Sequence, residues 1–312
     1  MRPNFYIVGA GRSGSTSLYA HCRRHPQIFM ARIKEPNHYI FRDERPAFGG
    51  PGVARARAIA VRDERTYERL FDGAAGRPVA GEASVNYLRF PHVARAIRDA
   101  TPDARLVIGL RQPVDRAYSS FVHKRDEGLE PLERFEDAWH DHDRRAAANW
   151  WHCMHKGKSL YLWQVRAYLE AFPRDRMHIL LFEDFARQPA RVLNGLWAFL
   201  GVAPLGDGDR PAHSNQSGEI DNWLLRQLWR RTTGLRAALM PLVPLPWRGR
   251  LFPFIASRRR TRRSNVPPLD PELRERLTLE LRDDILRLQD LIDRDLMAWL
   301  APPQASPAVR ET

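Results

Sequence analysis

A turn near the N-terminus carries the residues best suited to chemistry. The segment FYIVGAGRSGSTSLY contains Gly9, Gly11 and Gly14, together with one arginine and four hydroxyl side chains. Glycines allow successive backbone N–H groups to point at one anion, and a helix that starts there adds its dipole. We therefore predict a phosphate-binding loop. Its expected ligands are Gly11, Arg12, Ser13, Gly14, Ser15, Thr16 and Ser17.

The position of the cation separates this turn from the loop of ATP and GTP hydrolases. That loop reads G-x-x-x-x-G-K-[ST], whereas here Gly9 and Gly14 keep the spacing and Ser15 replaces the lysine. The cation lies inside the turn instead, at Arg12. A guanidinium stays protonated and makes paired hydrogen bonds to phosphate or sulfate, so Arg12 is suited to stabilising charge on a leaving oxygen.

A second group of residues is suited to proton transfer. Lys34, Glu35 and His38 follow a strand-like segment, QIFMARI, about 20 residues beyond the loop. An attacking hydroxyl or amine must lose a proton, and a carboxylate or an imidazole within hydrogen-bond distance can accept it. Taken without further context, a Glu beside a Lys is more often a solvated ion pair.

The elements that position these residues follow from the hydrophobic pattern. Residues 5–9 form an apolar run ended by glycine, which predicts a buried strand, and a helix is expected from about Ser15 to Arg24. Further strands are predicted at 78–81, 104–110 and 177–182, with helices at 63–71, 91–99, 113–125, 133–147, 160–172, 187–201 and 220–231. Alternating strands and helices predict an α/β fold with a central parallel sheet flanked by helices.

The rest of the chain completes a single domain over residues 1–301. Loops are expected at 42–62 and 203–218, and Asp270 begins a last amphipathic packing helix over 270–300. Residues 302–312 are predicted to be a flexible tail. The Leu-, Pro- and Trp-rich stretch at 234–256 is interpreted as a lid, with a contact to a membrane surface as the alternative.

Composition limits the classes of protein to consider. The 312 residues have 43% hydrophobic and 28% charged residues, which excludes a disordered or disulfide-based chain. The net charge of +13 comes from 46 arginines and four lysines against 37 acidic residues, and it favours an anionic ligand. Two cysteines and the lack of a long apolar segment predict a cytoplasmic protein without a transmembrane helix.

Several motifs occur in an order that resembles a known enzyme family. They are GAGRSGSTSLY, HPQIFM, KEPNHYIF, GEASVNYL, LRQPVDRAYSSF and KGKSLYLWQVRAYLEAFPRDRMHILLFEDF. Together they are similar to the sulfotransferases that use 3′-phosphoadenosine 5′-phosphosulfate (PAPS), especially bacterial members and the sulfotransferase domains of heparan-sulfate enzymes. The resemblance implies a P-loop-like sulfotransferase fold, PAPS as sulfate donor, its desulfated form PAP as product, and no metal.

The resemblance also assigns roles to individual residues. It implies that Arg12 stabilises the bridging and 5′-phosphate oxygens, and that Glu35 is the base, with His38 as second choice and Lys34 beside it. The remaining implied residues are Arg111 and Ser119 for the 3′-phosphate, Arg262 and Arg263 for the cofactor phosphates, and Ser84 and Tyr87 for the acceptor cleft. Glu183 and Asp184 are expected to be structural.

The sequence therefore predicts transfer of a sulfuryl group from PAPS to a hydroxyl or amine, on a glycan in the first instance, with no nucleic-acid partner. Two alternatives stay open. One is a nucleotide or small-molecule kinase on a related phosphate-loop fold, and the other is a non-catalytic polyanion binder driven by the net charge. The histidines and Cys153 between residues 140 and 155 lack a recognised zinc spacing, so we interpret them as a polar helix face.

Overall fold

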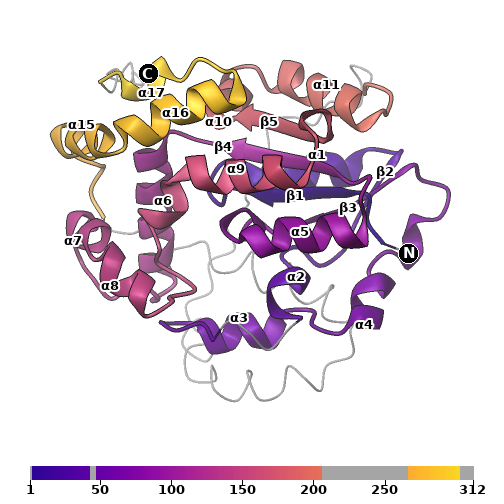
Figure 1. Ribbon diagram of the computed structural model, residues 1–312, viewed down its shortest axis with the longest axis horizontal. Helices are drawn as coiled ribbons and strands as arrows, with labels where there is room; N and C mark the ends of the chain where they lie inside the picture. Colours follow the sequence, from indigo (N-terminus) through magenta and orange to yellow (C-terminus); the bar gives the residue numbers. More distant parts are fainter. Residues whose placement is uncertain (1, 43–46, 206–265, 303–312) are drawn as a thin grey trace, which may run out of the picture.

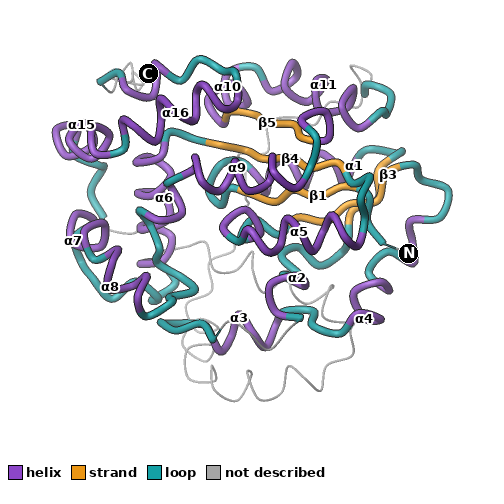
Figure 2. The backbone as a smooth tube through the Cα atoms, in the orientation of Figure 1, coloured by secondary structure: helices purple, strands orange, loops and turns teal. Residues whose placement is uncertain are grey.

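The computed structural model describes residues 2–42, 47–205 and 266–302. Within them the chain forms a parallel sheet with the strand order β2-β3-β1-β4-β5. The strands are β1 (Phe5–Gly9), β2 (Ile28–Met30), β3 (Val79–Ala83), β4 (Arg105–Leu110) and β5 (Met177–Leu181). Figures 1 and 2 show the sheet in the middle of the molecule with helices around it. The predicted α/β fold with a central parallel sheet is confirmed.

Alternate side chains of the central strands enter two separate cores. On β1, Phe5 and Ile7 pack into the core under one layer of helices, whereas Tyr6 and Val8 pack into the core on the other side. The first core is covered by α1 (Ser15–Arg24) and α11 (Pro189–Leu200), and the second by α5 (Pro91–Ala100), α9 (Tyr161–Ala171) and α16 (Arg282–Ile292). Since both faces are covered, β1 is apolar throughout and its neighbours are mostly so, which made these strands recognisable in the sequence.

The remaining helices lie around the sheet and the two layers that cover it (Figure 1). They are α2 (His38–Phe41), α3 (Val53–Ile59), α4 (Glu64–Arg69), α6 (Pro113–Asp126), α7 (Phe135–His140), α8 (His142–Ala147), α10 (Phe182–Arg187), α15 (Pro271–Glu280) and α17 (Met297–Leu300). Short 3-10 turns lie at Asp72–Ala74, Tyr87–Arg89, Gly157–Ser159 and Arg174–Arg176. The expectation of an unbroken loop over 42–62 is wrong, because α3 lies inside that range.

Two predicted helices are each divided. The pattern over 133–147 forms α7 and α8, which meet at Asp141, and the pattern over 187–201 forms the end of α10 and then α11. Pro189 is the first residue of α11. Proline lacks an N–H and is tolerated in the first turn of a helix, so it begins a new helix more readily than it continues one.

The predicted C-terminal helix over 270–300 is three helices, α15, α16 and α17. The apolar stripe is nevertheless buried as expected, at Leu277, Leu281, Ile285, Leu288, Ile292, Leu296 and Trp299. A straight helix of this length would extend about 45 Å and run past the core. Breaks at Leu281 and after Ile292 keep the stripe on the protein, and Asp270 caps the first helix through its side chain.

Several predictions concern residues outside the described ranges. These are the lid at 234–256, the helix at 220–231, the cofactor contacts of Arg262 and Arg263, and residues 303–312 of the tail. Of the helices that the structure does describe, none is long and apolar enough to span a membrane.

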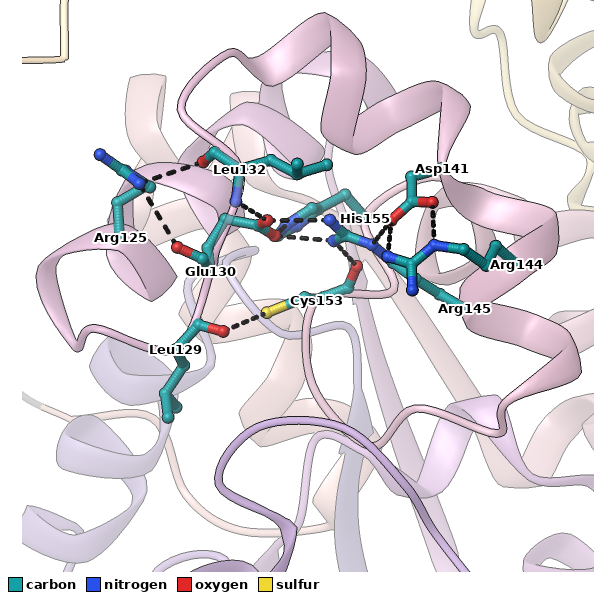
Figure 3. A network of polar contacts seen from close by, with 9 residues as sticks. All are labelled: Arg125, Leu129, Glu130, Leu132, Asp141, Arg144, Arg145, Cys153 and His155. Atoms are coloured by element: carbon teal, nitrogen blue, oxygen red, sulfur yellow. Dashed lines mark hydrogen bonds and ion pairs between the residues drawn. The ribbon is translucent and has the colours of Figure 1, made fainter.

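A buried ion-pair network joins the loop before α7 to α8 and to the segment after it (Figure 3). The Arg145 guanidinium donates to both carboxylate oxygens of Glu130, at 2.7 and 2.8 Å, and to the Cys153 carbonyl at 2.7 Å. The Asp141 carboxylate accepts from its Nε at 2.8 Å. His155 Nε2 lies 2.8 Å from Glu130 Oε2. The network thereby holds segment 151–156 against the end of α6.

The interpretation of Cys153 and His155 as part of a polar helix face is wrong. Both are buried in a loop, and their side chains lie close enough to Glu130 for the three to share a cation. However, Glu130 already accepts two hydrogen bonds from the Arg145 guanidinium, and Cys153 Sγ donates to the Leu129 carbonyl at 3.4 Å. A cation there would face a buried positive charge, so these donors do not fit a metal ion.

A second buried carboxyl group lies in the sheet, among tyrosines. Glu82 on β3 pairs with Tyr6 in the sheet and is completely buried. Ser84 Oγ donates to its Oε2 at 3.4 Å, and Oε1 has no hydrogen-bond partner in the described part of the chain. Burial raises the pKa of Glu82 to about 8, so the folded protein holds this carboxyl group protonated at neutral pH.

The first prediction concerns the Glu130 network. We expect Glu130→Gln to lower the free energy of unfolding by about 3–5 kcal/mol at neutral pH, because it leaves Arg145 buried without its main counter-charge. Burial opposes ionisation of Glu130, but hydrogen bonds from His155 and Arg145 bring its pKa to about 2, below the usual 4.5. The difference between parent and variant must therefore shrink as the pH falls from 4.5 toward 2.

This difference is measured by urea unfolding of the parent, Glu130→Gln and a matched control, Glu133→Gln. The control changes an exposed carboxylate on the same segment. Equal stability of the two variants at neutral pH would contradict it.

The second prediction has the opposite pH dependence. Because the pKa of Glu82 is raised, the unfolded chain releases this proton at lower pH than the folded chain, and the parent loses stability as the pH rises from 4.5 to about 8. Glu82→Gln removes that loss, so its stability relative to the parent must increase over this range. Urea unfolding between about pH 5 and pH 8 checks the trend, with exposed Glu170→Gln as control. A relative stability that is flat or falls with pH would rule it out.

Candidate functional site

The glycine turn connects β1 to α1 at the carboxyl edge of the sheet. The Ala10 N–H donates to the Gly109 carbonyl on β4 at 2.7 Å, which holds the turn against the neighbouring strand. Gly14 is the residue before α1 and adopts φ 83°, a conformation that favours glycine. The first hydrogen bond of α1 runs from Leu18 N–H to the Gly14 carbonyl, at 3.0 Å. The three preceding N–H groups, on residues 15–17, therefore have no carbonyl partner inside the helix.

Ser13 supplies a further unsatisfied group at this turn. Its side chain is buried, and its Oγ has no hydrogen-bond partner among the residues that the structure describes. A buried hydroxyl without a partner costs free energy that a bound acceptor recovers. Together with the free N–H groups at the start of α1, Ser13 makes the turn a cradle that fits a phosphate or sulfate group.

Arg12 joins the turn to the next strand and helix. It adopts φ 73°, which is unfavourable for a residue with a side chain and occurs most often at functional sites. Its Nε donates to Ser119 Oγ on α6 at 3.0 Å, and Arg111 Nη1 donates to the Arg12 carbonyl at 3.4 Å. The Arg111 guanidinium also lies 4.6 Å from the centre of the Phe182 ring. The structure thus brings together Arg12, Arg111 and Ser119.

A set of buried contacts positions Arg111 and the start of α6. The Gln112 N–H donates to Glu183 Oε1 at 2.9 Å, and Asp115 accepts two bonds from Arg274 on α15, at 2.8 and 3.1 Å. Glu183 therefore holds the start of α6, in keeping with the structural role expected of it. Arg116, also on α6, is buried and donates to Ser159 Oγ and the His155 carbonyl. It supports α6 and does not face the cradle.

Glu35 lies beside the turn in a second unfavourable backbone conformation, φ 61°. Its N–H donates to the Ala83 carbonyl at 2.8 Å, which places it at the end of β3. The carboxylate binds Lys34 Nζ through Oε1 at 2.8 Å and accepts from the Val85 N–H through Oε2 at 3.1 Å. Val85 in turn lies against Gly11, since a Cβ on Gly11 would be 3.3 Å from Val85 Cγ2. Glu35 and the cradle are therefore neighbours across Val85.

His38 does not lie with Glu35 at the edge of the sheet. It is completely buried and stacks on the Tyr67 ring, with the ring centres 4.1 Å apart. Nδ1 lies 2.9 Å from the Val61 carbonyl, and Nε2 lies 3.1 Å from Glu64 Oε2. Burial lowers the pKa of His38. Because both ring nitrogens are engaged away from the cradle, the structure does not support His38 as the alternative base.

Ser84 and Tyr87 do not line an open cleft. Both are buried: Ser84 Oγ accepts from the Asn37 N–H at 3.0 Å, and the Tyr87 hydroxyl accepts from the Tyr39 N–H at 3.3 Å. These bonds attach the short helix that follows Glu35 to the end of β3. The expectation that Ser84 and Tyr87 contact the acceptor directly is therefore corrected. Their side chains make buried hydrogen bonds and support the site from inside the protein.

The structure shows nearby basic residues that the sequence motifs did not single out. Burial lowers the pKa of His123, one turn along α6 from Ser119, against the attraction of Glu127, and repulsion by Lys124 and Arg12 lowers it further. Arg89 and Lys158 also approach this region, both near Asn86. The clearest sequence signal for Arg89 was its position directly after the motif GEASVNYL.

A family model described as "Sulfotransferase family" matches residues 3–205. The crystal structure of a sulfotransferase from Alicyclobacillus acidocaldarius is similar, with a TM-score of 0.73, 33% sequence identity, and coverage of 96% of this chain and 99% of that one.

Curated relatives are more distant. Carbohydrate sulfotransferase 15 of Rattus norvegicus is 26% identical, and the match covers 66% of this chain and 45% of the rat protein. Membrane-associated sulfotransferase kil1 of Dictyostelium discoideum is 21% identical, over 72% of this chain and 62% of the relative. The chain thus spans less than half the length of the rat protein. Since the family model matches most of the chain, including β1, the cradle, Glu35 and α6, the protein belongs to the sulfotransferase family.

Proposed function

We propose that this protein transfers a sulfuryl group from PAPS to a hydroxyl or amine of an acceptor, with a glycan as the expected acceptor. The observation that carries the proposal is the meeting of a glycine cradle, Arg12 and Glu35 at one edge of the sheet. The cradle offers the hydroxyl of Ser13 and the N–H groups at the start of α1. These donors fit the anionic end of the donor nucleotide.

Each residue then has a defined task. The cradle binds the 5′-phosphosulfate, and Arg111 and Ser119 bind the 3′-phosphate. When bound, PAPS supplies an activated sulfuryl group whose leaving oxygen belongs to a phosphate. Arg12 stabilises the negative charge that develops on that oxygen, because its guanidinium stays protonated. To do so, Arg12 exchanges its present bond to Ser119 for one to the donor.

Glu35 accepts the proton of the attacking group. As the new bond from the acceptor oxygen or nitrogen to sulfur forms, the bond from sulfur to the phosphate oxygen breaks, and the acceptor proton passes to a Glu35 carboxylate oxygen. Lys34 and the Val85 N–H each bind one oxygen of Glu35, so the carboxylate is held in a fixed orientation. In-line positioning and charge stabilisation are the main requirements of this class of transfer.

The first test of the proposal is the binding of PAP. We expect Arg12→Ala to weaken PAP binding about tenfold or more, because charge-assisted hydrogen bonds to phosphate are lost. Isothermal titration of PAP into the parent, Arg12→Ala and the control Arg24→Ala, an exposed arginine at the end of α1, measures the effect. Equal loss in both arginine variants would indicate general attraction to the positive charge, and tight binding of Mg-ATP in place of PAP would indicate a kinase.

The second test concerns the base. Glu35→Gln keeps an acceptor for the Val85 N–H but cannot take a proton, so we expect transfer to slow by about 10²–10⁴-fold with PAP affinity nearly unchanged. The measurement is transfer of labelled sulfate from PAPS to a panel of glycans, lipids and phenols. Glu64→Gln, which removes the carboxylate beside His38, is the matched control and should transfer at the parent rate. A Glu35→Gln variant as fast as the parent would overturn the assignment.

A further inference from the structure

Two cationic side chains converge on one carbonyl group next to the transfer site. Arg89 Nη1 donates to the Trp151 carbonyl at 3.2 Å, and Lys158 Nζ donates to the same carbonyl at 3.3 Å. Lys158 Nζ also donates to Asn86 Oδ1 at 3.0 Å. We call Asn86, Arg89, Trp151 and Lys158 the Arg89–Lys158 site.

No carboxylate balances these two charges in the part of the chain that the structure describes. Neither Arg89 nor Lys158 makes an ion pair there, and both contact only neutral oxygens and aromatic rings. Burial lowers the pKa of Arg89 to about 10. It also holds the pKa of Lys158 well below its usual value, with further repulsion from Arg89. Like charges brought together without a counter-ion favour the binding of an anion.

Contacts on both sides fix the position of this site. The segment that carries the Trp151 carbonyl is held by the buried network of Figure 3, in which Arg145 donates to the Cys153 carbonyl and pairs with Glu130. On the other side of Lys158, the Ser159 hydroxyl donates to the Pro113 carbonyl at 2.7 Å, which attaches this turn to the start of α6. As whole residues, Asn86, Arg89 and Lys158 are half-buried.

The position of the site relates it to the acceptor rather than to the donor. Asn86 directly follows Val85, whose N–H donates to Glu35 Oε2 and whose side chain lies against Gly11 of the cradle. The Arg89–Lys158 site therefore lies beyond Val85, on the Glu35 side. The proposed donor contacts of Arg111 and Ser119 lie on β4 and α6, on the Arg12 side of the cradle.

We propose that the Arg89–Lys158 site binds an anionic group of the acceptor, a carboxylate or a sulfate, and thereby sets which acceptors are used. This inference rests on the proposed function, because it places the acceptor on the Glu35 side of the cradle. An anion there supplies the missing counter-charge for both side chains. It also fixes the acceptor at a second point, which orients the attacking group toward the cradle.

The experiment compares a charged and a neutral sugar on the full chain saturated with PAP. Glucuronate and glucose are titrated by calorimetry at the same ionic strength, so that charges are screened equally in every titration. We expect glucuronate to bind more tightly than glucose. Lys158→Gln should weaken glucuronate binding about tenfold or more and leave glucose binding unchanged.

Lys156→Gln is the matched control, because this neighbouring lysine already has a counter-ion, Glu280, at 2.9 Å. It should bind glucuronate as the parent does. The affinity of each variant for PAP shows that the variant is folded.

Two results would overturn the inference while PAP binding is intact: glucuronate binding no tighter than glucose binding in the parent, or the same glucuronate affinity in the Lys158 and Lys156 variants. A parent protein that fails to bind PAP would instead contradict the proposed function.

Discussion

The contact between the turn after β1 and the end of β4 is the constraint on which the rest of the site depends. The Ala10 N–H reaches the Gly109 carbonyl, and the Ser13 carbonyl lies so close that a Cβ on Gly109 would be 3.0 Å from it. Only a residue without a side chain permits this approach without displacing the turn. The approach brings Arg12 to Arg111 and Ser119, so the cradle and the first turns of α6 act as one surface.

The structure stabilises buried carboxyl groups in two opposite ways. Glu130 is ionised, because a guanidinium and an imidazole share its oxygens and outweigh the cost of burial. Glu82 stays protonated among tyrosines, because burial disfavours its charged form and no cation in the described part of the chain pairs with it. Each supports the site through different contacts. Glu130 holds the segment that contains Trp151, and Glu82 binds Ser84, which in turn binds the chain that follows Glu35. The stability of the protein around the site is therefore expected to fall at low pH through Glu130 and to fall with rising pH through Glu82.

The abundance of arginine also separates into distinct uses. Arg116 and Arg145 are buried and bind carbonyl, hydroxyl or carboxylate oxygens of the protein, so they act as structural cross-links. Arg12 and Arg111 lie at the edge of the sheet, where the backbone turns away and an anion can approach. Sequence motifs singled out Arg12 and Arg111, but they did not show that Arg116 and Arg145 are structural, because a guanidinium serves either use and burial decides between them.

The sequence by itself determined the α/β fold, its strands, and the glycine turn with Arg12, because these depend on local features: apolar runs between glycines, and hydroxyls at the start of a helix. It also placed Glu35 beside the turn, through the motif it shares with its family. Tertiary structure alone decided that His38, Ser84 and Tyr87 are buried, that the last helix bends, and that Arg89 and Lys158 meet at one carbonyl. The physical reason is that burial and charge pairing arise from residues far apart in the chain, such as Asn86 and Lys158, whose approach no local pattern records.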